Sequence, residues 1–276
     1  MPKSSSQRTR KRISTASRAD RHELYERAVQ DPESDITFLT RTFERLRGRP
    51  PLSLREDFCG TASFCAAWVG SRRDRTAIGI DLDPDTLAWG KRRHLASAPE
   101  HVGRRVHLHQ ADVRDAVGAK SDITCAFNFS YFVFKSCEGM RHYFRAVRSR
   151  LVDDGMFFID LYGGPDSIKE DVTDTDYDDF LYHWDQAFFN PLTHDTLCHI
   201  HFSFPDGSRL NRAFSYDWRL WTVPELREIL LEVGFRKVHC FWERSDRNGE
   251  GTGVFYEPKG PVHAEDCWWT YIAAER

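Results

Sequence analysis

The sequence lacks the features of membrane, secreted and zinc-binding proteins. No segment approaches the roughly 20 consecutive apolar residues that a membrane-spanning helix needs. No apolar segment follows Met1, so we expect no secretory signal. The seven cysteines are odd in number, form no Cys-x-x-Cys pair and lie mostly in apolar surroundings. These absences predict reduced thiols in a cytoplasmic protein, and no disulfide framework or zinc site.

Charge is unevenly distributed along the 276 residues. Residues 1–20 contain six Lys or Arg residues and only Asp20 as an acid, a net charge of +5. The whole chain carries −3, which leaves −8 for the remainder. An acidic body disfavours a nucleic-acid partner. We expect the Ser- and Arg-rich residues 1–19 to form a disordered tail, with a nucleic-acid arm or an organelle transit peptide as functional alternatives.

Segments typical of strands and helices alternate along most of the chain. Two helices, over 20–30 and 36–48, are expected to form an N-terminal cap over residues 20–48. Strands are expected over 51–58, 76–81, 105–112, 122–129 and 156–164, and the helices between them over 62–70, 84–97 and 138–155. A helix over 222–235 and an antiparallel pair of strands over 237–244 and 267–276 follow.

This alternation predicts an α/β fold with a doubly wound, seven-stranded, mostly parallel sheet and a closing antiparallel hairpin. Residues 165–220 interrupt the pattern. Residues 165–179 carry seven acids and one lysine, which predicts a solvated loop. Strands over 180–189, 196–204 and 209–218 predict an antiparallel insert that serves as a substrate lid. We expect one domain over 20–276 behind the tail.

Polar residues follow the ends of successive expected strands, where ligands bind in parallel sheets. The stretch Cys59–Ala62 is a small-residue turn that opens a helix and brings backbone N–H groups to a ligand. Asp81 ends the second strand, and a carboxylate there is suited to accept hydrogen bonds from two ribose hydroxyls. Asp112 and Val113 follow the third strand and are suited to an exocyclic amine and a ring acceptor.

This order of residues resembles the class I S-adenosylmethionine-dependent methyltransferases over residues 52–164, and again over 222–276. In that family an acid on the first strand precedes a Gly-x-Gly-type loop, the second strand ends in the ribose-binding acid, and the third ends in an acid that faces the adenine amine. The resemblance implies S-adenosylmethionine as cofactor. It assigns Glu56 to the strand acid, Cys59–Thr61 to the loop, Asp81 to the ribose and Asp112 to the adenine.

The loop departs from the family pattern. Phe58 replaces the usual first glycine, Ala62 replaces the last, and Asp57 stands where an apolar residue is common. Because these residues lack the backbone freedom of glycine, we expect the loop to follow a different path. Arg55 either pairs with a neighbouring acid or meets the cofactor carboxylate. With two candidates from the N-terminal cap, the expected cofactor-binding residues are Arg21, Tyr25, Arg55, Glu56, Asp57, Cys59, Gly60, Ala62, Asp81, Leu82, Asp112, Val113, Asn128 and Phe129.

Three residues are candidates for catalysis on the acceptor side. The stretch NFSYFVFK, from Asn128 to Lys135, superficially resembles the Asn-Pro-Pro-Tyr box of amino-methylating nucleic-acid enzymes, with Tyr131 at the matching position and both prolines missing. In the insert, His199 and His201 alternate with apolar residues. Their face points either to solvent or into the cleft, where one histidine would remove a proton from the acceptor.

Two further features of the insert have open alternatives. His183, Asp185, His199 and His201 are suitable metal ligands by type, but no spacing fixes a site, and we predict no metal. Six aromatic residues either wall an acceptor pocket or belong to the core: Trp184, Phe188, Phe189, Tyr216, Trp218 and Trp221.

The predicted function is methyl transfer from S-adenosylmethionine to a nitrogen or oxygen of a small molecule by in-line displacement. The alternatives are a non-catalytic, methyltransferase-like binding module and the methylation of a nucleic acid or protein. A nicotinamide oxidoreductase is disfavoured, because Gly-x-Gly-x-x-Gly is absent after the first strand and Gly249, Gly251 and Gly253 lie in a late loop. The sequence leaves the acceptor and the oligomeric state open.

Overall fold

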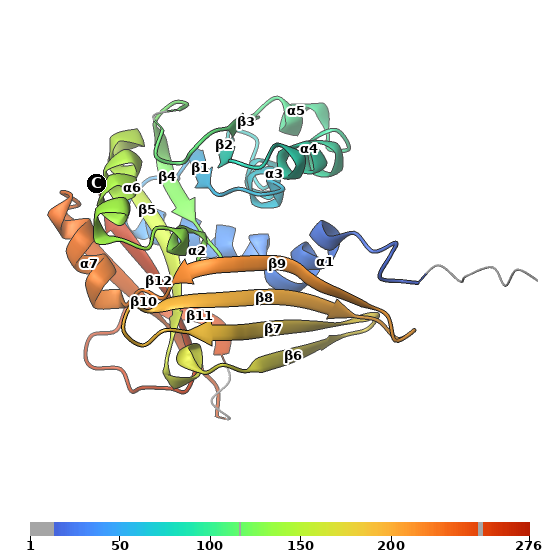
Figure 1. Ribbon diagram of the computed structural model, residues 1–276. Helices are drawn as coiled ribbons and strands as arrows, with labels where there is room; N and C mark the ends of the chain where they lie inside the picture. The colour runs from blue at the N-terminus through green and yellow to red at the C-terminus, as the bar shows by residue number, and fades with distance from the viewer. Residues whose placement is uncertain (1–13, 116, 248–250) are drawn as a thin grey trace, which may run out of the picture.

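A mixed eight-stranded sheet forms the centre of the molecule (Figure 1). The structure, a computed structural model, describes residues 14–115, 117–247 and 251–276. The strand order is β11-β10-β12-β5-β4-β1-β2-β3, in which β1 to β5 are parallel and β12, β10 and β11 are antiparallel. Their bounds are β1 (Ser53–Asp57), β2 (Thr76–Asp81), β3 (Val106–Gln110), β4 (Ser121–Ala126), β5 (Leu151–Gly163), β10 (Lys237–Ser245), β11 (Gly251–Tyr256) and β12 (Trp268–Glu275).

Helices cover both faces of this sheet, as the alternating pattern predicted. Apolar residues of α6 and α7 form one core cluster, and those of α2 and α3 form the other. No helix of the described residues is long and apolar enough to cross a membrane. The helical segments are α1 (Arg21–Val29), α2 (Pro32–Arg47), α3 (Ser63–Gly70), α4 (Pro84–Gly90) with its π-helical extension η1 (Lys91–Leu95), α5 (Glu100–Gly103), η2 (Ser130–Val133), α6 (Cys137–Arg150), η3 (Pro165–Ile168) and α7 (Val223–Glu232).

The insert forms a separate four-stranded antiparallel sheet of β6 (Val172–Tyr177), β7 (Phe180–Phe189), β8 (Asp195–Ser203) and β9 (Arg209–Arg219). In Figure 1 this sheet lies across one end of the molecule, with β9 on the side of α1. Ile200 and Phe202 of β8 pack with Leu24 of α1 in a third apolar cluster. The insert therefore packs on α1, whereas α2 packs with α3 against a face of the main sheet.

Three expected boundaries differ from the structure. The main sheet has eight strands because residues 251–256, expected as a loop, pair with β10 as an edge strand. Residues 172–177, expected as part of a solvated loop, pair with β7. The helix α6 ends at Arg150 and β5 begins at Leu151, so Gly155 lies in a strand and does not end the helix. In each segment the backbone hydrogen bonds of a neighbouring strand outweigh local composition.

Part of the predicted disordered tail is docked. Thr15 donates from its backbone N–H and from Oγ1 to Asp206, at 2.8 Å each. The backbone N–H of Ala16 donates to Ser208 Oγ at 3.0 Å. Residues 14–19 thus lie against the turn between β8 and β9, and residues 1–13 lie outside the described residues.

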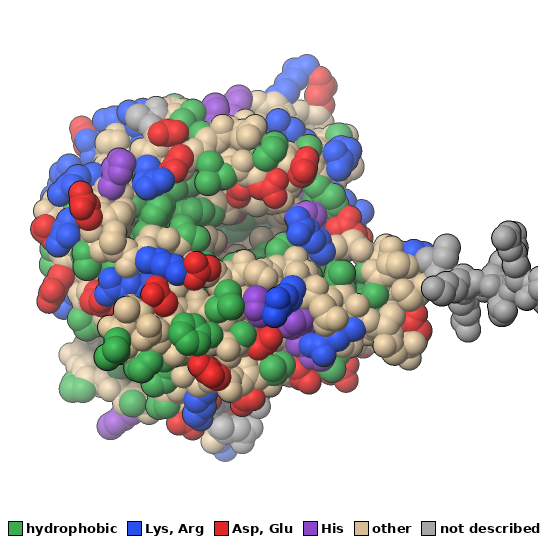
Figure 2. Space-filling view, viewed as in Figure 1, with side chains coloured by type: hydrophobic (Ala, Val, Ile, Leu, Met, Phe, Trp, Pro, Cys, Tyr) green, Lys and Arg blue, Asp and Glu red, His purple; other side chains and the backbone are tan. Residues whose placement is uncertain are grey.

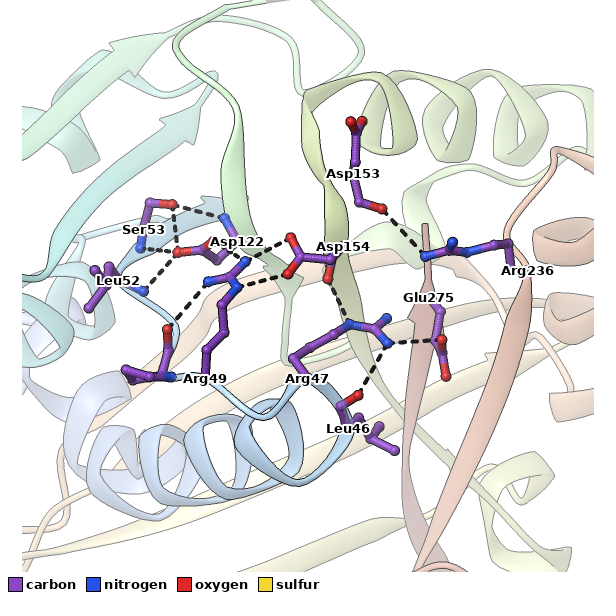
Figure 3. Close-up of polar contacts among 11 residues, drawn as sticks. Leu46, Arg47, Arg49, Leu52, Ser53, Asp122, Asp153, Asp154, Arg236 and Glu275 are labelled. Atoms are coloured by element: carbon purple, nitrogen blue, oxygen red, sulfur yellow. Dashed lines mark hydrogen bonds and ion pairs between the residues drawn. The ribbon is translucent and has the colours of Figure 1, made fainter.

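An ion-pair network lies at the amino ends of β1 and β4, opposite the ends where ligands bind in such sheets (Figure 3). Arg49 binds Asp154 through Nε and Nη2 at 2.8 Å each, and Nη2 also lies 2.8 Å from Asp122 Oδ1. The other oxygen of Asp122 accepts from the backbone N–H groups of Leu52 at 2.8 Å and Ser53 at 3.0 Å. Asp122 therefore fixes the entry of β1 beside β4.

We predict that Asp122→Ala lowers the free energy of unfolding by about 3 kcal/mol, because buried N–H donors lose their acceptor. Urea denaturation followed by circular dichroism measures this. Asp153→Ala is the control, since the Asp153 side chain is 98% exposed, and its effect should stay within about 0.5 kcal/mol. Equal effects of the two substitutions would contradict the structural role of Asp122.

Candidate functional site

The loop after β1 keeps left-handed backbone conformations without the usual glycines. Phe58, Gly60 and Ala62 have φ values of 58°, 51° and 59°. A left-handed conformation costs a non-glycine residue roughly 1–2 kcal/mol. The Gly60 N–H donates to Asp81 Oδ2 at 2.8 Å, and the other oxygen of Asp81 accepts from the Asp83 N–H at 2.9 Å. The Asp81 carboxylate thus fixes this loop and the turn after β2 together.

A cleft of about 580 Å³ opens at the carboxyl ends of β1, β2 and β4. Figure 2 shows the molecule hollowed between the main α/β layer and the four-stranded sheet. Residues of α1 and β9 close the cleft on the other side. Its lining includes seven of the residues expected at the cofactor: Arg21, Tyr25, Glu56, Cys59, Gly60, Asp81 and Asn128.

Arg55 and Asp57 do not line the cleft, so their predicted contact with the cofactor is wrong. Their side chains are buried and form an ion pair of 2.7 Å, which is the first of the two alternatives for Arg55. Arg55 also donates to the carbonyl oxygens of Val117 at 2.7 Å and Val113 at 3.0 Å. Burial raises the pKa of Asp57, an effect that Arg55 and a hydrogen bond from Tyr143 oppose. The pair holds the segment after β3 from within the core.

Five other expected contacts also lie outside the lining of the cleft, and one of them, Phe129, lines an adjoining cavity instead. Asp112 is bound by Arg114 through two hydrogen bonds of 2.9 and 2.6 Å, which lower its pKa. Val113 and Ala62 are buried, and Leu82 is exposed to solvent. The adenine contacts of Asp112 and Val113 therefore remain a prediction, and Asp112 Oδ2 retains a lone pair beyond its bond from Arg114.

Two polar groups of the cleft fit the charged end of S-adenosylmethionine. Burial, with a smaller contribution from Asp81, raises the pKa of Glu56 to about 8. Within the described part of the chain Glu56 forms no ion pair, and its Oε2 accepts from the Cys65 N–H at 3.2 Å. Gln30 Oε1 is buried without a hydrogen-bond partner. An ammonium group is a donor that matches both acceptors.

The N-terminal cap is tied to the loop after β1. Glu26 Oε1 accepts from Thr61 Oγ1 at 2.5 Å and lies 2.6 Å from His94 Nε2. Trp89 Nε1 donates to Asp20 at 2.6 Å. Helix α1 is thereby held over the cleft, with Arg21 and Tyr25 in its lining.

Asp160 holds the turn after β4 at the cleft, and the sequence analysis missed it. Its two carboxylate oxygens accept from the backbone N–H groups of Asn128 at 2.8 Å and Phe129 at 3.0 Å. Both residues are left-handed, with φ values of 55° and 57°. Burial raises the pKa of Asp160 to about 8. The available signal was a single acid within the apolar segment Met156–Leu161.

A small cavity of about 110 Å³ adjoins the cleft, with which it shares Tyr25, Asn128, Tyr216 and Trp218. We call it the aromatic box. The hydroxyls of Tyr25 and Tyr216 lie close enough to shift each other's pKa, and burial raises the pKa of both. The remaining lining residues are Val29, Phe129, Tyr182, Trp184 and Ile200.

The aromatic wall predicted for the insert is present in part. Trp184, Tyr216 and Trp218 line the box. The other three candidates lie elsewhere: Phe188 is exposed, Phe189 packs against the main core, and Trp221 is buried in it.

Tyr131 is not placed for catalysis, which corrects its predicted role. Its side chain is fully buried, and its hydroxyl donates to the Asp160 carbonyl oxygen at 2.7 Å. It lies in the core cluster beneath α6 and outside the lining of the cleft. It cannot stack on a base there, so the resemblance to the Asn-Pro-Pro-Tyr box does not extend to this position.

The predicted catalytic role of His199 and His201 is wrong for a different reason. Strand alternation places them on the face of β8 opposite Ile200, which lines the box. His199 Nδ1 lies 2.8 Å from Ser215 Oγ, and His201 Nε2 lies 3.1 Å from Asp185. Neither lines the cleft or the box. Within the described ranges no three His, Cys, Asp or Glu side chains are grouped to hold a metal ion.

No protein-family profile matches the sequence, and no curated protein matches it. Solved structures do match. A methyltransferase from Clostridium acetobutylicum, named as S-adenosylmethionine-dependent, is 16% identical, with 92% of this chain and 96% of the other covered at a TM-score of 0.65. CalS10, an amino pentose methyltransferase from Micromonospora echinaspora with S-adenosylmethionine bound, is 13% identical at the same coverage and TM-score. The sugar N-methyltransferase KedS8 from Streptoalloteichus is 16% identical over 100% and 99%, at 0.62.

The fold is that of the class I S-adenosylmethionine-dependent methyltransferases. In this methyltransferase fold, the carboxyl ends of β1 and β2 carry Glu56 and Asp81, and both line the cleft. The insert forms a second sheet, separate from the main one, and the sequence analysis predicted only an antiparallel insert.

We predict that Gly90→Ala displaces the loop after β1. A Cβ at Gly90 would lie 1.9 Å from the Thr61 carbonyl oxygen, so α4 and the loop must separate. We expect thermal unfolding to show that the free energy of unfolding falls by about 1–3 kcal/mol. The control Gly70→Ala meets nothing within 4 Å and should gain up to about 1 kcal/mol from helix propensity. A stabilising effect of Gly90→Ala would contradict the close approach.

Stability should fall as the pH rises from 5 to 8.5. Burial raises the pKa of Asp35 to about 6, and those of Glu56 and Asp160 to about 8. Because these pKa values exceed those of the unfolded chain, the folded state binds more protons, and its stability is lost as the pH rises through them. Differential scanning calorimetry should show a lower midpoint at pH 8.5 than at pH 5. Glu56→Gln should reduce that difference; an unchanged difference would contradict the raised pKa of Glu56.

Proposed function

We propose that this protein transfers a methyl group from S-adenosylmethionine to an amino nitrogen of a small molecule. The observation that carries the proposal is the cleft lined by Glu56, Gly60 and Asp81, which adjoins the aromatic box at Asn128. This arrangement supports a methyl acceptor at the end of β4, beside the expected position of the methyl donor.

Different residues of the cleft bind different parts of the cofactor. Asp81 accepts from the ribose hydroxyls, because each of its oxygens retains a lone pair beyond its present backbone bond. Glu56 accepts from the ammonium group of the methionine end, and that cation favours the ionised form of the carboxyl. When bound, S-adenosylmethionine supplies an electrophilic methyl group on a sulfonium centre.

The aromatic box favours an amine over a neutral hydroxyl. Its rings stabilise the positive charge that a neutral amine nitrogen gains as it takes the methyl group, and no ionised side chain is among the described residues that line it. Since burial raises the pKa of Tyr25 and Tyr216, both hydroxyls stay protonated and orient the nitrogen without removing a proton. With the cofactor bound, the neutral nitrogen would supply the lone pair for the new bond to the methyl carbon, the sulfur would leave with the electrons of the carbon–sulfur bond, and the proton of the methylated nitrogen would pass to water.

The named activities of similar structures support this choice. KedS8 is a sugar N-methyltransferase, and MtfA, which is 17% identical at a TM-score of 0.55, is a glycopeptide N-methyltransferase. Catalysis would rest on alignment and the exclusion of water. His199 and His201 have no part in it, because they lie on the opposite face of β8.

Isothermal titration calorimetry tests the cofactor. We expect the wild type to bind S-adenosylmethionine, and Asp81→Asn to lose roughly 2–4 kcal/mol, which is about 30-fold to 1,000-fold in affinity. Asp85→Asn is the matched control, because it removes the same charge in the first turn of α4, at an exposed position outside the cleft. No heat with the wild type, or equal losses in the two variants, would overturn the assignment.

Screening amines for release of S-adenosylhomocysteine separates an enzyme from a binding module. Turnover of amines, with no turnover of the matching alcohols, is the expected result. Cofactor binding without turnover of any acceptor would favour the non-catalytic module, and turnover of nucleic acid or protein would favour the macromolecular alternative.

A further inference from the structure

A third cavity, of about 380 Å³, lies beyond Phe129 at the carboxyl end of β5. Four further aromatic residues line it: Tyr162, Trp242, Trp268 and Trp269. Among the described residues that line it, Glu243 and Glu265 are the charged ones, and none is Lys, Arg or His. We call it the acidic aromatic cavity. Neither the proposed cofactor contacts nor the proposed methyl transfer uses it.

Two glycines allow the wall of this cavity to form. A Cβ at Gly163 would lie 2.3 Å from the indole of Trp268. A Cβ at Gly164, whose φ is 101°, would lie 2.5 Å from the Asp266 carbonyl oxygen. The segment before β12 therefore lies directly against the end of β5. Trp268 also packs on Trp242, with 5.2 Å between ring centroids, so the aromatic wall is continuous.

The two carboxylates are held in place without a cationic partner. Glu243 Oε1 accepts from the Gly253 N–H at 2.7 Å, and Glu265 Oε1 accepts from Ser245 Oγ at 2.9 Å. Neither glutamate forms an ion pair with any residue that the structure describes. Negative charge beside aromatic faces attracts an organic cation, whose alkyl or aryl groups the rings also desolvate favourably. A phosphate or carboxylate ligand would be repelled.

Phe129 joins this cavity to the aromatic box, since it lines both. Its ring centroid lies 4.6 Å from that of Tyr162 and 6.3 Å from that of Trp269 on one side. On the other side it lies 6.5 Å from Trp218 of the box. One aromatic ring thus separates the expected methyl-acceptor position from the two glutamates.

We infer that the acidic aromatic cavity binds an organic cation, and that this cation is the distal end of the methyl acceptor. The acceptor is accordingly a molecule with two nitrogen centres: a neutral amine in the box, and an ammonium group beyond Phe129. This second part rests on the proposed function, whereas the cation site itself does not.

Tryptophan fluorescence of the full chain tests the site, because three of its lining residues are tryptophans. The probes are benzyltrimethylammonium and, as its anionic counterpart, phenylacetate. We expect saturable quenching by the cation and none by phenylacetate. The double substitution Glu243→Gln and Glu265→Gln keeps an acceptor oxygen for Gly253 and Ser245, and should weaken cation binding at least about tenfold. Glu232→Gln, a charge removal on α7, should leave binding unchanged.

Quenching that is unsaturable, or equal in the double variant and the wild type at an unchanged thermal midpoint, would overturn the cation site. Kinetics test the link to the acceptor. The probe should inhibit methyl transfer competitively against the amine found by screening, and not against S-adenosylmethionine. Inhibition that is non-competitive toward that amine would overturn the link.

The two proposals fail separately. Cofactor binding by calorimetry without saturable binding of benzyltrimethylammonium would overturn the further inference and leave the proposed function standing. Binding of benzyltrimethylammonium without cofactor binding would overturn the proposed function and support the cation site alone.

Discussion

Carboxylates that accept backbone hydrogen bonds hold the strand ends on which the cleft depends. Asp81 fixes the Gly60 and Asp83 N–H groups, and Asp160 fixes those of Asn128 and Phe129. The turns they hold contain left-handed non-glycine residues, which relax in the absence of an external restraint. The price of this arrangement is a carboxyl group in an apolar setting, as the raised pKa of Asp160 records.

Helix α1 of the N-terminal cap and the insert cover the carboxyl ends of the strands, where they enclose adjoining cavities. Helix α1 is tied to the loop after β1 through Glu26, and its Tyr25 meets Tyr216 of β9. The apolar face of the four-stranded sheet therefore looks inward, and its histidine face looks outward. An acceptor that enters between these elements meets rings and hydroxyls, with no ionised base, so positioning and exclusion of water carry the chemistry.

The positions of charge divide the molecule by role. Arg49, Asp122 and Asp154 pair with one another at the amino ends of the strands, where they stabilise the fold. Arg55 and Asp57 do so inside the core. Glu56, Glu243 and Glu265 form no ion pair within the described residues, and each lines a cavity. A carboxylate left without a cation beside a cavity is the feature that both functional proposals use.

Local sequence determined the elements whose signals are local. The periodicity of apolar residues predicted the alternation of strands and helices. The caps Asp20 and Thr222 are local signals too, because a capping side chain bonds to backbone within three residues. Glu56 and Asp81 were found for the same reason, because they lie at the carboxyl ends of β1 and β2. The edge strands β6 and β11 were missed, since pairing with a neighbour decides them.

Tertiary structure alone decided which side chains share a cavity. Arg55, Asp57 and Tyr131 stand beside cleft residues in sequence, yet their side chains point into the core. Asp160 reaches the turn after β4 from a strand 32 residues away. The sequence specifies which groups are available, but burial and partners depend on contacts between distant segments, and these contacts exist only once the sheet, the cap and the insert have packed together.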